Sequence, residues 1–206
     1  MEHYETEEQQ VEAIKRFWKE YGLSIVGGAV LGLGGLWGWN YYQQNQLAEQ
    51  EVASAAFEQV MNSANSIDDL SAAAEAFRAE HGSAGYNALT DLLQASSAVE
   101  AGELDKAASF LEAAIGKLDN STKPLAQLRL ARVQLAQDNA DAALATVTAI
   151  NNDAYAVQRD ELKGDLLVAK GDVIGARSAY QAAADAGGAQ SNPALQLKID
   201  QLAHAS

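Results

Sequence analysis

Residues 21–42 read YGLSIVGGAVLGLGGLWGWNYY and contain no Asp, Glu, Lys, Arg or His. As an α-helix rising about 1.5 Å per residue, this stretch is about 33 Å long, enough to cross a hydrocarbon core of about 30 Å. A single segment in lipid satisfies its backbone groups only as a helix. Aromatic residues of the kind found at membrane–water interfaces stand at both ends of it: Tyr21, Trp37, Trp39, Tyr41 and Tyr42. The stretch predicts one transmembrane helix over residues 21–42.

Two other interpretations of this stretch fit less well. A buried core helix of a soluble protein is usually shorter and rarely ends in four aromatic residues. A cleaved signal peptide has an apolar core of about 7–15 residues after a basic leader. Here the apolar core is longer, and residues 1–20 hold six acidic and three basic residues. A cleavage-like sequence at Ala53-Ser54-Ala55 is separated from the apolar core by polar residues that begin at Asn40. We therefore expect an uncleaved anchor.

The flanking charges predict the orientation of the anchor. Lys15, Arg16 and Lys19 precede it, and no Lys or Arg follows until Arg78. Basic residues near the ends of a membrane helix favour the cytoplasmic side. The chain is therefore expected to comprise an acidic cytoplasmic tail with a short amphipathic helix (1–20), the transmembrane helix (21–42) and a large domain on the opposite side (43–206). Residues 43–62 contain no Gly or Pro, so one helix is expected to continue from the anchor into that domain.

The anchor is unusually rich in glycine, which costs roughly 1 kcal/mol of helix propensity per residue relative to alanine. Gly28, Gly32 and Gly35 fall on one helix face, and Gly34 and Gly38 fall with Gly27 on a neighbouring face. Small residues at this spacing allow two helix backbones to approach closely in lipid. Because glycine is also generally common in membrane helices, the pattern favours helix packing without saying whether the partner is a second copy of the chain.

The composition of the chain limits its possible functions. Residues 1–20 contribute three of the net −14 charges and residues 21–42 none, so the remainder is strongly acidic and is not expected to bind nucleic acid. The absence of cysteine excludes disulfides, thiol catalysis and zinc–thiolate sites. Abundant alanine and only two prolines favour helices over sheets. The sequence thus predicts an all-α protein.

Three segments repeat one pattern: residues 96–115, 131–150 and 164–184. A small residue recurs before each expected turn, and small and larger residues recur after it at fixed spacing. The matching sets are Ala95, Ala131 and Gly164; Gly102, Asp138 and Gly171 at the turns; Ala107, Ala143 and Ala176; Leu111, Val147 and Tyr180; and Ala114, Ile150 and Ala183. Ala73 and Phe77 extend the pattern to a degenerate first unit over residues 47–80.

A helix–turn–helix pattern with a period near 34 residues resembles the tetratricopeptide repeat. No single unit buries its apolar face, so the units must stack into an α-solenoid. Ser191-Asn192-Pro193 begins a final helix that we expect to cap the stack. The alternative is a generic alanine-rich bundle, because Asp138 replaces a usual Gly and the aromatic residues typical of the first helix are missing.

In tetratricopeptide-type arrays the first helix of each unit lines a concave face that binds polypeptide segments. By this analogy the face combines apolar residues with acidic patches. Its candidate residues are Leu89, Leu92, Val99, Leu128, Arg132, Leu135, Glu161, Asp165 and Val168. The alternative for some of these leucines is burial under the capping helix.

No residue pattern in the sequence indicates catalysis. His3, His81 and His204 lack metal-ligand spacing, and His3 is expected on the other side of the membrane from the other two. The anchor glycines do not match a phosphate-binding loop. Acidic pairs such as Asp68-Asp69 stand at expected helix starts, where they complement the helix dipole. We therefore expect no enzyme activity, no cofactor and no metal site.

Several segments together resemble the YfgM family of bacterial inner-membrane proteins. They are the opening MEHYETE, then QVEAIKRF, the glycine-rich anchor that ends in Gly38-Trp39-Asn40-Tyr41, LRLARVQ and GARSAY. The resemblance implies an ancillary subunit of the SecYEG translocon, partnered with the membrane-anchored periplasmic chaperone PpiD. It also implies a tetratricopeptide-like periplasmic domain and a role in the hand-over of secreted proteins.

The predicted function is that of a non-enzymatic, single-pass inner-membrane adaptor at the SecYEG translocon, with bound unfolded or secreted polypeptides as further partners. Two alternatives stay open. One is a regulator of envelope stress that acts through the acidic cytoplasmic tail. The other is a homo-oligomeric scaffold anchored in the membrane.

Overall fold

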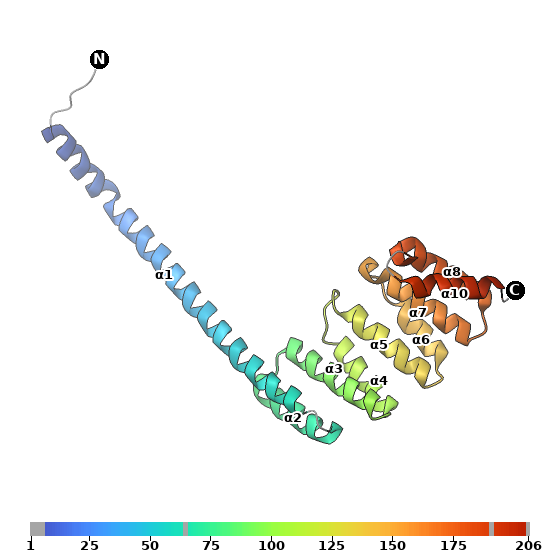
Figure 1. Ribbon diagram of the computed structural model, residues 1–206. Helices are drawn as coiled ribbons and strands as arrows, with labels where there is room; N and C mark the ends of the chain where they lie inside the picture. Colours follow the sequence, from blue (N-terminus) through green and yellow to red (C-terminus); the bar gives the residue numbers. More distant parts are fainter. Residues whose placement is uncertain (1–6, 64–65, 190–191, 205–206) are drawn as a thin grey trace, which may run out of the picture. The chain divides into compact units, whose positions relative to one another are not determined.

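The structure is a computed structural model that describes residues 7–63, 66–189 and 192–204. In these ranges every regular element is a helix. The elements are α1 (Glu7–Asn62), α2 (Ile67–His81), α3 (Ala84–Glu100), α4 (Leu104–Ile115), α5 (Lys123–Ala136), α6 (Ala140–Thr148), η1 (Asp153–Tyr155), α7 (Ala156–Ala169), α8 (Val173–Ala183), η2 (Ala184–Gly188) and α10 (Pro193–His204) (Figure 1). The chain divides into two compact units, residues 1–55 and 56–206, which are described separately.

In the first unit, the described residues belong to the single helix α1. The amphipathic residues before Tyr21, the apolar stretch and the polar residues after Tyr42 all lie in this helix without interruption. The expectation that one helix continues past the anchor is therefore confirmed. Its 56 residues include seven glycines, yet no residue of the helix is a proline that would remove a backbone donor.

The second unit is a series of helix pairs. The last residues of α1 pack with α2, and the pairs α3/α4, α5/α6 and α7/α8 follow, with α10 packed on α8. The second helix of each pair also packs on the first helix of the next, which is how a solenoid buries the face that one pair leaves open. The predicted all-α fold, with an apolar N-terminal helix and a repeat array that ends in a capping helix, is confirmed (Figure 1).

Each of the last three helix pairs turns in the same way. The predicted turn residues Gly102, Asp138 and Gly171 all adopt the left-handed conformation, with φ of 76°, 59° and 78°. The next backbone N–H donates to a carbonyl five residues back, and these bonds are Glu103 to Ala98 (2.8 Å), Asn139 to Gln134 (2.9 Å) and Asp172 to Leu167 (2.9 Å). This is the Schellman motif, which satisfies carbonyls that the helix end leaves free. Asp138 is the one described residue other than glycine with positive φ.

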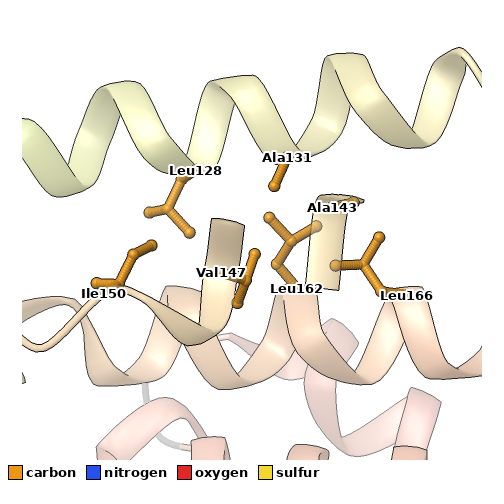
Figure 2. Close-up of a cluster of buried hydrophobic side chains, with 7 residues drawn as sticks. All are labelled: Leu128, Ala131, Ala143, Val147, Ile150, Leu162 and Leu166. Atoms are coloured by element: carbon orange, nitrogen blue, oxygen red, sulfur yellow. The ribbon is translucent and has the colours of Figure 1, made fainter. Parts of the chain in front are cut away.

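The small and large positions of the repeat form the core. Every member of the four aligned sets in the helices is buried, from Ala95 in the first to Ala183 in the last. Figure 2 shows one such cluster, in which Leu128 and Ala131 of α5 face Leu162 and Leu166 of α7, with side chains from and after α6 between them. The paired small and large residues therefore set the distance between neighbouring helices, as the repeat predicted.

The Gly164–Tyr180 pair is the closest approach in this pattern. A Cβ atom on Gly164 would lie 2.3 Å from Cε1 of the Tyr180 ring, so only glycine leaves room for this aromatic residue, which stands four positions after Ala176. In the first helix pair the predicted larger residue Phe77 is buried, but the small position differs by one residue. Ala74 is fully buried with Leu70 and Phe77, whereas the predicted Ala73 is only partly buried.

Helix α10 begins where the sequence predicted. Asn192 Oδ1 accepts a hydrogen bond from the Ala194 N–H (3.1 Å), and Pro193 takes the first helical position. Its Leu195 is fully buried against α8, whereas Gln196 and Asp200 bond to each other on its exposed side. An apolar inner side and a mainly polar outer side, on which Leu197 is also exposed, suit a terminal cap.

Candidate interaction surfaces

Apart from Gly22, the apolar stretch of α1 is exposed in the described part of its unit. By length and composition α1 holds a segment able to cross a membrane, with mean hydropathy of 1.4 over its best window, of which 6% is buried. Trp37 stacks on Tyr41, and Trp39 lies beside Tyr42, while all four rings remain more than half exposed. At the other end Phe17 pairs with Tyr21. Such exposed apolar side chains with aromatic residues at both ends match a hydrocarbon environment better than water.

The anchor glycines have open space beside them. A Cβ atom at Gly28, Gly32 or Gly35 would meet nothing within 4 Å, and the same holds on the neighbouring face at Gly27, Gly34 and Gly38. Gly22 differs, because a Cβ atom there would lie 2.6 Å from Cε3 of Trp18, whose ring covers it. The two predicted glycine faces are thus available to an external helix, and their role in packing stays a prediction.

The second surface is formed by the first helices of the repeat pairs, α3, α5 and α7. Leu89 and Val99 on α3 and Val168 on α7 are 44%, 45% and 43% exposed. Arg132 on α5 is also exposed. Leu92 and Leu135 are half-buried against the core clusters of their units. Residues at equivalent positions of successive units share one face of a solenoid, and we use the name A-helix face for this surface.

The prediction that Leu128 belongs to the A-helix face is wrong. Its side chain is 2% exposed and packs with Val147, Leu162 and Leu166 between α5, α6 and α7 (Figure 2). Burial by the neighbouring pair, and not by the capping helix, removes it from the surface. Leu128 therefore contributes to stability and is not available to bind a partner.

Glu161 and Asp165, two further predicted residues on α7, are bound by α10. Lys198 Nζ lies 2.9 Å from Glu161 Oε1 and 2.7 Å from Asp165 Oδ1. Asp165 also accepts a hydrogen bond of 2.7 Å from the Tyr180 hydroxyl, and Asn192 donates to Glu161 (3.0 Å). This set of residues, the C-terminal polar cluster, ties the cap to the last helix pair.

Two pKa values in the C-terminal polar cluster are displaced. Burial raises the pKa of the Tyr180 hydroxyl, and its hydrogen bond to the Asp165 carboxylate raises it further. For Lys198, burial acts to lower the pKa, but the hydrogen bonds and charges of Asp165 and Glu161 outweigh it, and the pKa is raised. At neutral pH Lys198 therefore carries its proton as an ammonium group and Tyr180 is a neutral phenol.

Sequence reasoning missed a buried charged cluster at the start of the repeat domain. Asp91 on α3 is 2% exposed, yet it binds Arg78 from α2 and Lys117, which follows α4. Arg78 also donates to Gln94 (2.7 Å), and Gln94 donates to Ser71 (3.2 Å). The cluster joins α2 to the α3/α4 pair, and removing Asp91 would leave two cations without their shared partner. The only signal in the sequence was a lone acid in a helix interior.

The described residues offer little for metal or cofactor chemistry. Within residues 7–63, 66–189 and 192–204, no group of three or more His, Asp and Glu side chains is placed to hold a metal ion. The predicted tail includes His3, which lies outside the described residues. His81 packs against the Phe77 ring near the end of α2.

Comparison with known proteins gives a consistent result over nearly the whole chain. A family model described as a tetratricopeptide repeat-like domain matches residues 15–204. A protein named "Ancillary SecYEG translocon subunit" from Escherichia coli (strain K12) is 40% identical over 210 residues, covering 98% of this chain and 99% of its own. Proteins with the same name from Aggregatibacter actinomycetemcomitans and Haemophilus influenzae are 32% and 29% identical, each covering 95% of this chain and 97% of their own. No solved structure matches the chain.

Proposed function

This chain belongs to the tetratricopeptide repeat-like family of ancillary SecYEG translocon subunits, the YfgM family, and we propose that it is a non-enzymatic adaptor at the translocon. The observation that carries the proposal is the similarity over 98% of the chain to a relative with that name. The relatives' names support a translocon-associated role, and a translocon-associated chain with one apolar N-terminal helix is consistent with an inner-membrane protein.

The proposed attachment is through α1. Residues 21–42 would span the membrane, with residues 1–20 on the cytoplasmic side and residues 43–206 in the periplasm. Support comes from Lys15, Arg16 and Lys19 on one side of the apolar stretch and from the exposed aromatic residues at both of its ends. The open space beside Gly28, Gly32 and Gly35 supports close packing with a membrane helix of the translocon or of a PpiD-like chaperone.

The proposed second contact is the A-helix face. Exposed Leu89, Val99 and Val168, together with exposed Arg132, offer apolar and charged contacts to a polypeptide segment. Such a segment could belong to the chaperone or to a secreted protein during hand-over. Each unit then has a separate role, because α1 holds the protein at the translocon and the repeat domain binds its clients or partner.

The test is purification of the full-length protein from membranes in mild detergent, followed by identification of the proteins that accompany it. The variant Gly28→Leu with Gly32→Leu fills one glycine face. We expect it to lose most of the translocon subunits and the chaperone, while circular dichroism of the repeat domain is unchanged. Val26→Phe with Val30→Phe is the matched control, because these residues have the same spacing and lie on the side of the helix opposite Gly28, Gly32 and Gly35.

The outcomes separate the alternatives. Equal capture by the glycine variant and the control would contradict helix packing as the means of attachment. Recovery of further copies of the chain, without translocon subunits, would contradict the adaptor and favour the homo-oligomeric scaffold. Capture that persists unless residues 1–20 are removed would place the contact in the tail.

A further inference from the structure

Helix α5 differs in charge from the rest of the chain. Residues 120–137 contain no Asp or Glu, although the chain has 28 acidic and only 14 basic residues. Three of those basic residues, Lys123, Arg129 and Arg132, lie in α5. Helix α5 is therefore electropositive, although the domain that contains it has a strong net negative charge.

Arg129 and Arg132 stand together on the outer side of α5. With Leu125 they occupy positions i, i+4 and i+7 of one helix face, and all three side chains are exposed. Among the described residues, neither arginine has an acidic side chain within salt-bridge distance. Most other cations of the domain do, including Arg78, Lys117, Lys170 and Lys198. The two guanidinium groups therefore keep their full capacity to bind carboxylates.

The neighbouring helices do not neutralise this pair. One repeat earlier, the position equivalent to Arg132 is Ser96, which is uncharged. One repeat later it is Asp165, whose carboxylate is already bound by Lys198 and Tyr180. Exposed Leu89 and Val99 on α3 supply apolar surface on the same A-helix face. The face thus offers two arginines without acidic partners among the described residues, with exposed apolar side chains on α3 and at Leu125 of α5.

We propose that the A-helix face binds a polypeptide segment in which acidic residues alternate with apolar ones, and that Arg129 and Arg132 bind the carboxylates of this segment. This rests on the proposed function, in which that face binds polypeptide. A guanidinium matches a carboxylate by two parallel hydrogen bonds, which gives specificity as well as affinity. The negative charge of the surrounding domain repels acidic segments elsewhere, so α5 determines where such a segment can bind.

The experiment measures fluorescence anisotropy of labelled peptides with the full-length protein in neutral detergent. Three probe peptides share one pattern of leucine and alanine and differ only in carrying Glu, Gln or Lys at the same polar positions. We expect the Glu peptide to bind about tenfold more tightly than the Gln peptide, which corresponds to about 1.4 kcal/mol. The preference should weaken as salt is raised, because the contacts are exposed.

Variants of α5 test whether the preference for the Glu peptide depends on its two arginines. Arg129→Gln with Arg132→Gln should bind the Glu and Gln peptides equally, with unchanged thermal unfolding because the native side chains have no acidic partners among the described residues. Lys163→Gln is the control: it removes a basic residue of α7 and should keep the preference. Arg132→Lys should keep part of it, because the charge remains but the planar fork is lost.

Each of the following results would contradict a specific part of the proposal. If the native protein binds the three peptides equally, the acidic preference is wrong and polypeptide binding by the face stands. If it binds none of them, both proposals for the face are wrong. If Lys163→Gln abolishes the preference as fully as the arginine variant, α5 is not the recognition element.

Discussion

Small residues serve opposite purposes in the two units of this protein. In the repeat domain a Cβ atom at Gly164 would collide with the Tyr180 ring at 2.3 Å, and one at Gly188 would lie 2.8 Å from Leu195. In α1 a Cβ atom at Gly28, Gly32 or Gly35 would meet nothing within 4 Å. The first group is small because another side chain of the chain fills the space. The second group is small beside space that no described residue fills.

The difference shows how to distinguish a helix face that is packed within the chain from one that is open to another molecule. A glycine in a helix costs about 1 kcal/mol relative to alanine, so it requires compensation somewhere. At Gly164 the compensation is the packing of an aromatic ring within the same molecule. In α1 the predicted compensation is close packing with another membrane helix, which is the interaction that small residues provide.

The largest expected effect separates these two kinds of glycine. Gly164→Ala should lower the free energy of unfolding of the repeat domain by about 2 kcal/mol, because overpacking costs about 3 kcal/mol and helix propensity returns about 1. Gly28→Ala should leave it unchanged. Urea unfolding followed by circular dichroism measures both.

A control within the repeat domain excludes a general effect of glycine replacement. Gly85 lies in α3 with nothing within 4 Å of its Cβ position. Gly85→Ala should therefore raise stability by up to about 1 kcal/mol. Equal destabilisation by Gly164→Ala and Gly85→Ala would remove the basis of the comparison.

A second prediction concerns the attachment of the capping helix α10 to the end of the repeat domain. The pKa values of Lys198 and Tyr180 are both raised in the folded protein, so both groups bind their protons more tightly than in the unfolded chain. Their contribution is complete below the unfolded values and is lost as the pH rises from about 10 through the folded values. Hydrogen exchange should show α10 opening at alkaline pH before the α3/α4 pair.

The matched variant is Lys198→Met, which keeps the aliphatic part of the side chain. It should cost about 1 kcal/mol at neutral pH and reduce the alkaline opening of α10. If native and variant proteins open α10 over the same pH range, Lys198 does not control the cap.

The smallest expected effect lies in the turns. Asp138 adopts φ of 59°, whereas glycine occupies the equivalent turns at Gly102 and Gly171. Asp138→Gly should raise the free energy of unfolding by about 0.5 kcal/mol, since left-handed strain is relieved while unfolded-state entropy increases. Gly102→Asp should lower it by a similar amount. Unfolding temperatures that shift in opposite directions for the two variants would support the equivalence of the turns. Shifts in the same direction would contradict it.

The repeat was predictable because its signals are local and recur. A small residue, a left-handed turn and a second small residue at fixed spacing identified the buried positions of three helix pairs, including Ala131, Ala143 and Tyr180. A separate analogy, to the exposed first-helix positions of tetratricopeptide arrays, placed Leu128 on the surface, because it ignored how large the side chains of α6 and α7 are. With Val147 and Leu162 opposite it, Leu128 is enclosed.

The polar clusters were not predictable because their members come from different units. Asp91 lies 13 residues from Arg78 and 26 from Lys117, and Asp165 lies 33 from Lys198. No periodic pattern connects such residues before the helices are stacked. The free pair Arg129 and Arg132 became recognisable only by contrast, once the structure showed which cations already have partners.

The polar outer side of α10 also has a consequence for assembly. A stack of similar units has no inherent length, because each end resembles the surface to which the next unit would be added. Without α10, the apolar side of α8 around Ala176, Tyr180 and Ala183 would be open to another molecule, and head-to-tail contacts of that kind propagate into filaments. The short helix with Gln196 and Asp200 facing outward thus acts as a terminator of polymerisation, which matters most for a protein concentrated in the plane of a membrane.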